Sequence, residues 1–176
     1  GAAKKYKDVV LIKLGADVEF AALVGGQLQN DAAKLTHRLR ILPDGGASIS
    51  SEALSRNLEQ ALGRSACFEE YQELYRKGHP GLAAVLQDYA TNLAVALENI
   101  ETLQDPEIIL VGGELAVWYD VLCPLLKTEM NSRKMTLPVR EGLLGSDAAP
   151  LGAVRVCLNH FMNERQSAAA GLAARA

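Results

Sequence analysis

The chain has little that would support a disulfide framework, a zinc site or a membrane span. Its three cysteines, Cys67, Cys123 and Cys157, are odd in number and far apart, which favours neither disulfides nor zinc. Each is expected to be a small buried hydrophobic residue. No apolar run approaches the roughly 18 residues that a spanning helix needs, and residues 1–7 lack the apolar core of a signal peptide. We therefore expect a cytoplasmic protein without metal or cofactor.

Basic charge is also scarce, because the formal net charge is -3. DNA-binding domains are usually basic, so we expect DNA contact only through an N-terminal segment that this chain does not contain. The abrupt start, a few residues before the apolar run 9–12, indicates a domain cut from a longer protein. A length of 176 residues is enough for one domain with a real core. We expect a single domain over residues 1–166 and an Ala-rich, frayed or disordered tail over residues 167–176.

Hydrophobic periodicity predicts an α/β fold. The chain opens with an antiparallel meander, predicted at residues 9–14, 18–24 and 27–29. Helical patterns follow, predicted at residues 51–62, 67–77 and 82–103. Strands and helices then alternate, predicted at residues 108–111, 118–131, 136–139 and 149–163. Pro124 is expected to kink the second of these elements or to mark its start. A meander that feeds α/β crossovers is typical of the ribonuclease-H-like lobe of the actin and sugar-kinase fold, in which helices flank parallel strands.

The paired glycines Gly112 and Gly113 are the first candidates for a binding site. They end the apolar run 108–111, as at a buried strand that stops in a tight turn. Glycine lets backbone N–H groups approach a ligand closely, and several folds place a phosphate in this way at the carboxyl end of a strand. The alternative is a strand-to-loop turn that binds nothing. Trp118, shortly after this turn, is either a stacking platform for a sugar or part of a contact between helices.

Three stretches together resemble the ROK family, which takes its name from repressors, open reading frames and kinases. Residues 10–28 look like the glycine-rich hairpin of that family. Residues 103–113 (LQDPEIILVGG) are similar to its junction between a long helix and a strand that ends in two glycines. Residues 144–153 (LGSDAAPLGA) resemble its last turn into a helix. The resemblance covers nearly the whole chain and implies the second half of such a protein.

The chain departs from the family where phosphate chemistry would be expected. ROK kinases carry an Asp-x-Gly phosphate loop and a catalytic aspartate in their first domain, and neither is present here. The hairpin glycines of the family help to hold nucleotide phosphates. In this chain the loop after Gly15 is bulkier and carries Asp17 and Glu19, which would repel phosphate. Without a third partner this acidic pair is not expected to bind a metal.

The resemblance also implies a Glu-x-x-His motif that binds sugar hydroxyls and is completed by a cysteine cluster around zinc. His37 matches the histidine, but Lys34 replaces the glutamate, and an ammonium group can only donate hydrogen bonds. No cysteine follows in residues 44–52, so no zinc is expected. Glu52 aligns with the acid that closes the motif if several residues are deleted. The alternative is that Glu52 favours the dipole at the start of a helix.

These observations predict the effector-sensing and oligomerising C-terminal domain of a sugar-responsive ROK-type transcriptional regulator, without catalytic activity of its own. The expected ligand-binding residues are His37, Glu52, Gly112 and Gly113. A sugar or sugar phosphate is the expected effector, and a homodimer is the expected assembly, formed through residues 82–103 or residues 51–77. Two alternatives stay open. One is a fragment of a ROK sugar kinase whose other domain supplies the nucleotide, and the other is a degenerate interaction module.

Overall fold

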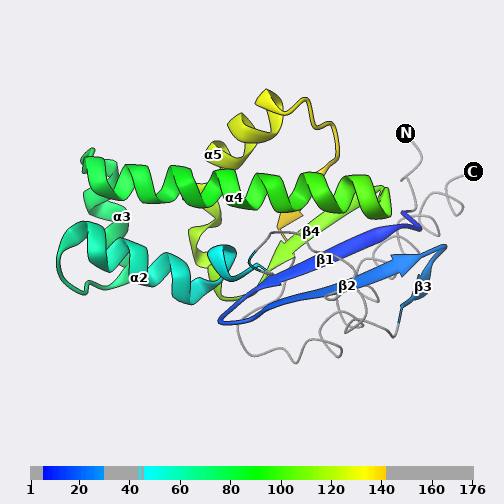
Figure 1. Ribbon diagram of the computed structural model, residues 1–176, viewed down its shortest axis with the longest axis horizontal. Helices are drawn as coiled ribbons and strands as arrows, with labels where there is room; N and C mark the ends of the chain where they lie inside the picture. The colour runs from blue at the N-terminus through cyan, green and yellow to red at the C-terminus, as the bar shows by residue number, and fades with distance from the viewer. Residues whose placement is uncertain (1–5, 30–43, 45, 142–176) are drawn as a thin grey trace, which may run out of the picture.

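A computed structural model describes residues 6–29, 44 and 46–141 (Figure 1). Five strands form one mixed sheet in the order β3-β2-β1-β4-β5. The strands are β1 (Val9–Leu14), β2 (Val18–Val24), β3 (Gln27–Leu28), β4 (Ile108–Gly112) and β5 (Val139–Glu141). The helices are α2 (Ser51–Leu62), α3 (Phe68–Arg76), α4 (Pro80–Gln104) and α5 (Tyr119–Ser132), with the short 3-10 turns η1 (Ala47–Ile49) and η2 (Glu114–Trp118). The predicted α/β class is confirmed, with an antiparallel meander at one side of the sheet and parallel strands at the other.

The pairing of β1 brings three chain segments to one edge of the sheet. β1 runs parallel to β4, so that Val9 lies opposite Ile108 and Lys13 lies opposite Gly112. β1 runs antiparallel to β2, with Leu14 opposite Val18. The carboxyl ends of β1 and β4 and the turn between β1 and β2 therefore meet at the same edge. We call this the carboxyl edge, formed by residues 14–17 and 112–114.

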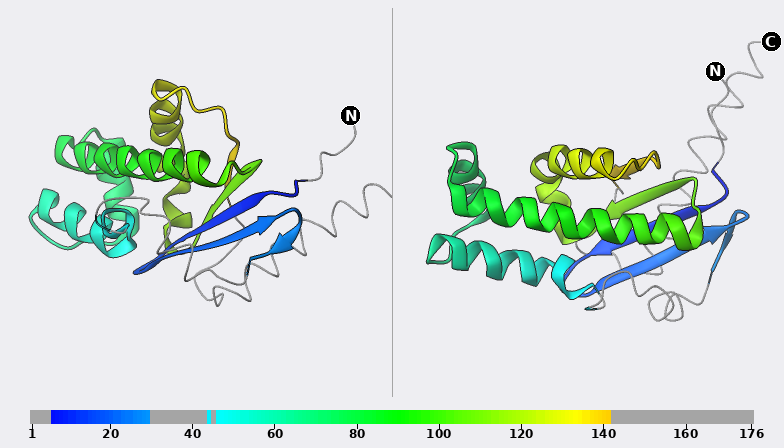
Figure 2. Two further views of the ribbon diagram at one scale, coloured as in Figure 1. Left: turned by 45° about the vertical axis from the view of Figure 1, so that its right-hand side comes forward. Right: turned by 45° about the horizontal axis from the view of Figure 1, so that its top comes forward.

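Helix α4 covers one face of the sheet (Figures 1 and 2). Its Leu97 and Ile100 are fully buried and belong to the same hydrophobic cluster as Ile12 and Ile109 of the sheet. In α4 the residues of this cluster recur every three or four positions, and in β1 and β4 they recur at every second position, as the periodicity of the sequence predicts. α4 also packs against α2, α3 and α5. Because α4 packs both on the sheet and on these three helices, it holds them in place relative to the carboxyl edge.

Capping residues set the helix ends where the sequence places them. The Ser50 hydroxyl accepts a hydrogen bond from the Ala53 amide at 3.1 Å and starts α2, which ends at Gly63. His79 is the N-cap of α4: its Nδ1 accepts a hydrogen bond from the Leu82 amide at 3.3 Å. Asp105 ends that helix in a left-handed conformation, directly before Pro106. The predicted boundaries of these helices are thus confirmed to within a few residues.

One predicted boundary in the second half is wrong. The strand expected over residues 136–139 is instead β5, which begins at Val139. Pro138 has no N–H to donate, so only its carbonyl joins the ladder, accepting from the Ile109 amide at 3.0 Å. Helix α5 (Tyr119–Ser132) confirms the helix predicted at residues 118–131 to within one residue; it runs through Pro124, so only the alternative of a start at that proline is wrong. The helix expected at residues 149–163 and the tail lie outside the described residues.

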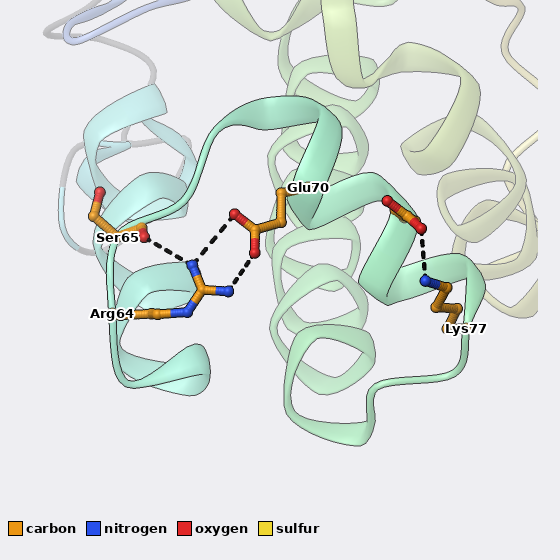
Figure 3. Close-up of polar contacts among 5 residues, drawn as sticks. Arg64, Ser65, Glu70 and Lys77 are labelled. Carbon is orange, nitrogen blue, oxygen red and sulfur yellow. Dashed lines mark hydrogen bonds and ion pairs between the residues drawn. The ribbon is translucent and has the colours of Figure 1, made fainter.

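Ion pairs and hydrogen bonds fasten the connection between α2 and α3. Arg64, just after α2, bonds both carboxylate oxygens of Glu70 in α3 and also the Ser65 carbonyl (Figure 3). The hydrogen bond from Arg64 lowers the pKa of Glu70. Lys77 pairs with Glu73 at 2.6 Å across one helical turn.

Among the helices in the described part of the chain, none combines the length and the apolar character that a membrane span requires.

Candidate functional site at the carboxyl edge

The start of α2 is fastened to the carboxyl edge by two hydrogen bonds. The Ser51 amide donates to the Gly15 carbonyl at 2.8 Å. The Ser51 hydroxyl donates to Oε2 of Glu114 at 2.6 Å, although the two residues are far apart in the sequence. Ser51 therefore connects the end of β1 to the turn after β4, and a carboxylate stands beside the strand-end glycines.

Gly113 is required by the close approach of two backbones. Its φ of 99° is a conformation that residues with a Cβ atom rarely adopt. A Cβ built on Gly113 would lie 2.6 Å from the carbonyl oxygen and 2.8 Å from the amide nitrogen of Leu14. No side chain fits at that distance. The strand-to-loop turn therefore accounts for this glycine on steric grounds alone.

A hollow opens beside the carboxyl edge, with a volume of about 760 Å³. We call it the edge groove. It is lined by residues 16–19 after β1, by the loop residues Asp44, Gly46, Ala47, Ser48 and Ser50, and by Glu52, Ala53, Arg56 and Asn57 of α2. This size lies within the range of about 300–1,000 Å³ that is usual for small-molecule sites. Parts of the chain that the sequence separates widely thus form one polar concave surface.

The charged side chains that line the edge groove are mostly anionic. Among the described lining residues, four carboxylates stand against the single guanidinium of Arg56: Asp17, Glu19, Asp44 and Glu52. Glu19 pairs with Lys13 at 3.0 Å, and its side chain remains 38% exposed. Carboxylates accept hydrogen bonds, so this surface suits a ligand that donates several of them.

Asp44 holds the loop that forms one wall of the groove. Its carboxylate accepts from the Gly46 amide at 3.0 Å and from the Ser48 amide at 2.8 Å. Partial burial raises the pKa of Asp44, but the hydrogen bonds from Gly46 and Ser48 outweigh that effect, and the pKa lies below its usual value. Asp44 is therefore ionised at neutral pH and has a structural task as well as a charge.

The sequence and the fold that carry this groove can be compared with those of known proteins. No protein-family model matches this sequence. No curated protein matches it either. The chain is, however, similar in structure to a ROK-family protein of Streptococcus pneumoniae in complex with sucrose, with a TM-score of 0.69 and 17% identity over 92% of this chain and 61% of that one.

Two further structures show the same likeness. A ROK-family glucokinase of Streptomyces griseus, in complex with glucose and AMPPNP, matches with a TM-score of 0.67 and 20% identity over 89% of this chain and 62% of that one. A ROK-family transcriptional regulator, a homologue of the E. coli MLC protein, matches with a TM-score of 0.58 and 16% identity over 86% of this chain and 46% of that one. This chain has the ROK fold. The resemblance drawn from the sequence is confirmed at that level.

The chain spans less than two thirds of these ROK structures: 61% of the streptococcal protein, 62% of the glucokinase and 46% of the regulator. Its own residues are matched almost throughout, so it has the fold of a part of such proteins. The matched proteins include both kinases and a regulator. The likeness therefore establishes the ROK fold and leaves the choice between these two activities to other observations.

The ROK-type site residues expected from the sequence do not all come together. Glu52 lines the edge groove and lies in the first turn of α2, where an acid also favours the helix dipole. Gly112 and Gly113 lie at the end of β4 and do not line the groove. The next residue, Glu114, accepts a hydrogen bond from Ser51, which stands between the groove residues Ser50 and Glu52. His37 lies outside the described residues, so its role as a ligand stays a prediction.

Other expectations about this ROK-type lobe have clearer outcomes. Trp118 is buried and packs edge-to-face on Phe68 of α3, with ring centroids 4.7 Å apart, so the prediction of a contact between helical elements is confirmed. Cys67 is exposed and Cys123 half-buried, and the expectation of a buried Cys67 is wrong. Cys67 precedes α3 as its N-cap, where no strand or helix periodicity turns it inward. Within residues 6–29, 44 and 46–141, no three potential ligand side chains converge to hold a metal ion.

Sequence analysis does not identify several residues in the groove and beside it. The signal Pro43-Asp44-Gly45-Gly46 predicts a loop but assigns no role to the carboxylate of Asp44. Arg56 follows Glu52 by four positions, the spacing that puts two side chains on one face of a helix, so a signal for Arg56 is present in the sequence. Ser51 and Glu114 carry no local signal for each other, because their contact exists only once β1 and β4 are paired.

Proposed function

We propose that the chain belongs to the ROK family and is the effector-sensing, oligomerising half of a sugar-responsive transcriptional regulator, without catalytic activity of its own. In this proposal residues 1–166 form one actin-like lobe and residues 167–176 a frayed tail. The edge groove supplies this lobe's share of the effector site, and the protein is cytoplasmic. Support for a sugar ligand comes from the fold, since two of the similar structures contain sucrose or glucose.

The carboxyl edge is the observation that carries the non-catalytic part of the proposal. Nucleotide phosphates bind where backbone amides at a strand end are open and positive. Here the turn at Gly113 packs against the backbone of Leu14. The next residue, Glu114, places its carboxylate beside this turn, where the carboxylate accepts a hydrogen bond from Ser51. A phosphate beside Glu114 would be repelled unless a cation intervened. This arrangement favours a sensor over a kinase.

Sensing would work through a shift between two arrangements of a dimer. A ligand can move such an equilibrium only if it binds the two arrangements with different affinities. In this proposal the groove, which a loop, a β-turn and the start of a helix form, would bind the effector with different affinities in the two arrangements. DNA contact is assigned to an N-terminal segment beyond this chain, which accords with the net charge of -3.

The second candidate is part of a ROK sugar kinase, and the comparisons give it weight because most of the similar structures are kinases. The residues encoded upstream of Gly1 discriminate between the two. A basic helix-turn-helix there supports the regulator. An Asp-x-Gly-x-Thr-like phosphate loop without such a helix-turn-helix supports the kinase and overturns the proposal.

Titration calorimetry of hexoses and hexose phosphates against the full-length protein tests the sensing part, because this chain alone holds one side of the cleft and is expected to bind little by itself. We expect heat of binding from at least one hexose, and no change when ATP and magnesium are added. Absence of heat with every hexose would reject the sensor and favour an interaction module that binds no small molecule. Turnover of ATP with a hexose by this chain unaided would reject the statement that it is not catalytic by itself.

A further inference from the structure

The sheet has a second apolar face, on the side away from α4. Side chains alternate between the two faces of a strand, so β1, β2 and β4 each place every second residue on this side. The apolar residues there are Val9, Leu11, Ala21, Leu23, Ile108 and Leu110. The strand register arranges them in two rows across the three strands, one row centred on Val9 and the other on Leu11. We call this patch the second face.

The second face is covered, but not by the core that the described helices form. Each of its six side chains is at most 7% exposed. The hydrophobic cluster that joins α2, α4 and α5 to the sheet contains the alternate residues of the same strands, such as Val10, Ile12 and Ile109, and none of these six. β4 is buried at all five of its positions, as a strand is when both faces of its sheet are covered. The cover of the second face therefore comes from another segment or another molecule.

We propose that residues 149–163 form a helix of the same chain that packs on the second face. The apolar residues of this segment recur at Leu151, Val154, Leu158 and Phe161, in steps of three and four that put them on one face of a helix. An amphipathic helix of this kind is stable only when its apolar face is buried. The sheet and the segment thus each have an apolar surface that the other can cover.

The dimensions of the segment match those of the second face. A helix over residues 149–163 is about 22 Å long and about 10 Å wide. The six residues of β1 span about 20 Å, and three neighbouring strands span about 10 Å. Residues 142–148, which connect β5 with the segment, can extend over about 24 Å, whereas β5 and β2 lie about 14 Å apart across the sheet. The segment can therefore reach every strand of the second face.

Two other possible covers fit less well. Four of the fourteen residues 30–43 are charged, whereas only Arg155 is charged among the twelve residues 151–162. Burial of a charge against an apolar sheet is costly, so residues 30–43 are the poorer match. A second copy of the chain is not needed, because the six side chains of the second face are already buried within a single chain.

The inference concerns the core of the lobe and does not depend on the proposed function. It removes the second face from the surfaces that are open to another domain or another copy. The contacts of the proposed dimer are then left to the helices on the α4 side of the sheet. It also makes residues 149–163 a part of the folding unit, so the unit does not end with β5.

Methyl NMR of the full 176-residue chain tests this packing directly. With labelled leucine and valine methyl groups, we expect nuclear Overhauser contacts from Leu158 to Leu11 and Leu110. A sample that mixes two differently labelled copies should show no such contacts between copies. Contacts of Leu11 and Leu110 with residues 30–43 instead, or with another copy alone, would overturn the proposal, as would the lack of any contact partner.

A pair of substitutions tests which side of the segment is in contact. Leu158→Asp puts a charge on the apolar face and should lower the Tm of the chain by roughly 10 °C. Val156→Asp is the matched control, because position 156 lies about 200° away around a helix, and it should shift the Tm by less than about 2 °C. Leu158→Ala adds no charge and should still lower the Tm by about 5 °C, which keeps the test readable if the aspartate variant does not fold. Equal shifts at positions 156 and 158 would overturn the docking of one apolar face.

Discussion

At the scale of single residues, the carboxyl edge depends on one glycine for its geometry. Gly113 combines a positive φ with a contact distance that leaves no space for a side chain. The sequence points to this residue as a possible phosphate cradle. Its necessity has another cause, the backbone of Leu14 across the β1–β4 ladder. A glycine at a strand end is therefore weak evidence for a ligand until the space around its Cα is known.

Substitution of Gly113 by alanine should destabilise the protein strongly. The new methyl group would collide with the Leu14 backbone and also hold a strained conformation, so we expect a loss of about 2–4 kcal/mol in the free energy of unfolding. Urea denaturation followed by circular dichroism measures this loss.

Gly63→Ala is the matched control, since Gly63 also has a positive φ, 78°, but no described atom lies within 4 Å of the position that its new methyl group would take. That variant should lose only about 1–2 kcal/mol, the cost of the left-handed conformation alone. Equal losses in the two variants would show that the contact with Leu14 is not what demands a glycine at position 113.

At the scale of elements, the sequence predicts correctly the boundaries that local interactions set, and it fails where the pairing of distant strands decides. β1 and β2 have the predicted bounds, because each alternates or runs apolar up to a glycine turn. α2 begins and ends at its capping residues. Around residues 136–139 the apolar side chains Met135 and Leu137 are buried without strand pairing, so periodicity predicts the right burial and the wrong ladder.

The candidate site is harder to predict than the elements that carry it. Glu52 can be found because a family motif and a helix start both mark its position. Asp44 and Arg56 reach the groove through a loop and a helix face whose relation is fixed by packing on α4. The bond between Ser51 and Glu114 joins segments that become neighbours only when β4 pairs with β1. Local patterns cannot encode such contacts.

The contact of η2 with α3 offers a test at the same scale. Trp118 is the single tryptophan of the chain, and Phe68 meets it edge-to-face. Phe68→Ala should expose the indole, shift its fluorescence to longer wavelength and lower the free energy of unfolding by about 1–3 kcal/mol. Glu69→Ala, one position along on the exposed side of α3, should leave the emission unchanged. An unshifted spectrum in the Phe68 variant would contradict the docking of α3 on η2.

At the scale of the whole molecule, the absence of a metal is a prediction of its own. A structural zinc site needs about four nitrogen or sulfur ligands, and the segment after His37 has no cysteine to join it. We expect elemental analysis of the purified protein, after dialysis against metal-free buffer, to find far less than one zinc per chain. A stoichiometric zinc would refute this interpretation of the segment around His37.

Self-association is the second property of the whole molecule. The proposed regulator needs a dimer, and α4 or the pair α2 and α3 are the surfaces assigned to it. Much of α4 is already buried inside the lobe, which leaves its end, where Leu103 is 55% exposed, as the apolar part available to a partner. Light scattering coupled to size exclusion should give about twice the chain mass of 18.9 kDa. A protein that stays monomeric would remove oligomerisation from this half of the proposed regulator.

Substitution of Leu103 by aspartate tests which surface forms the dimer. An unpaired charge in an apolar interface costs several kcal/mol, so the variant should dissociate at concentrations where the unmodified chain is dimeric. Val117→Asp is the matched control, because Val117 is 59% exposed but belongs to η2, outside the helices assigned to the contact. Dissociation by the Val117 variant alone would move the interface to the carboxyl edge, and the dimer would then cover the turn that leads from β4 into α5.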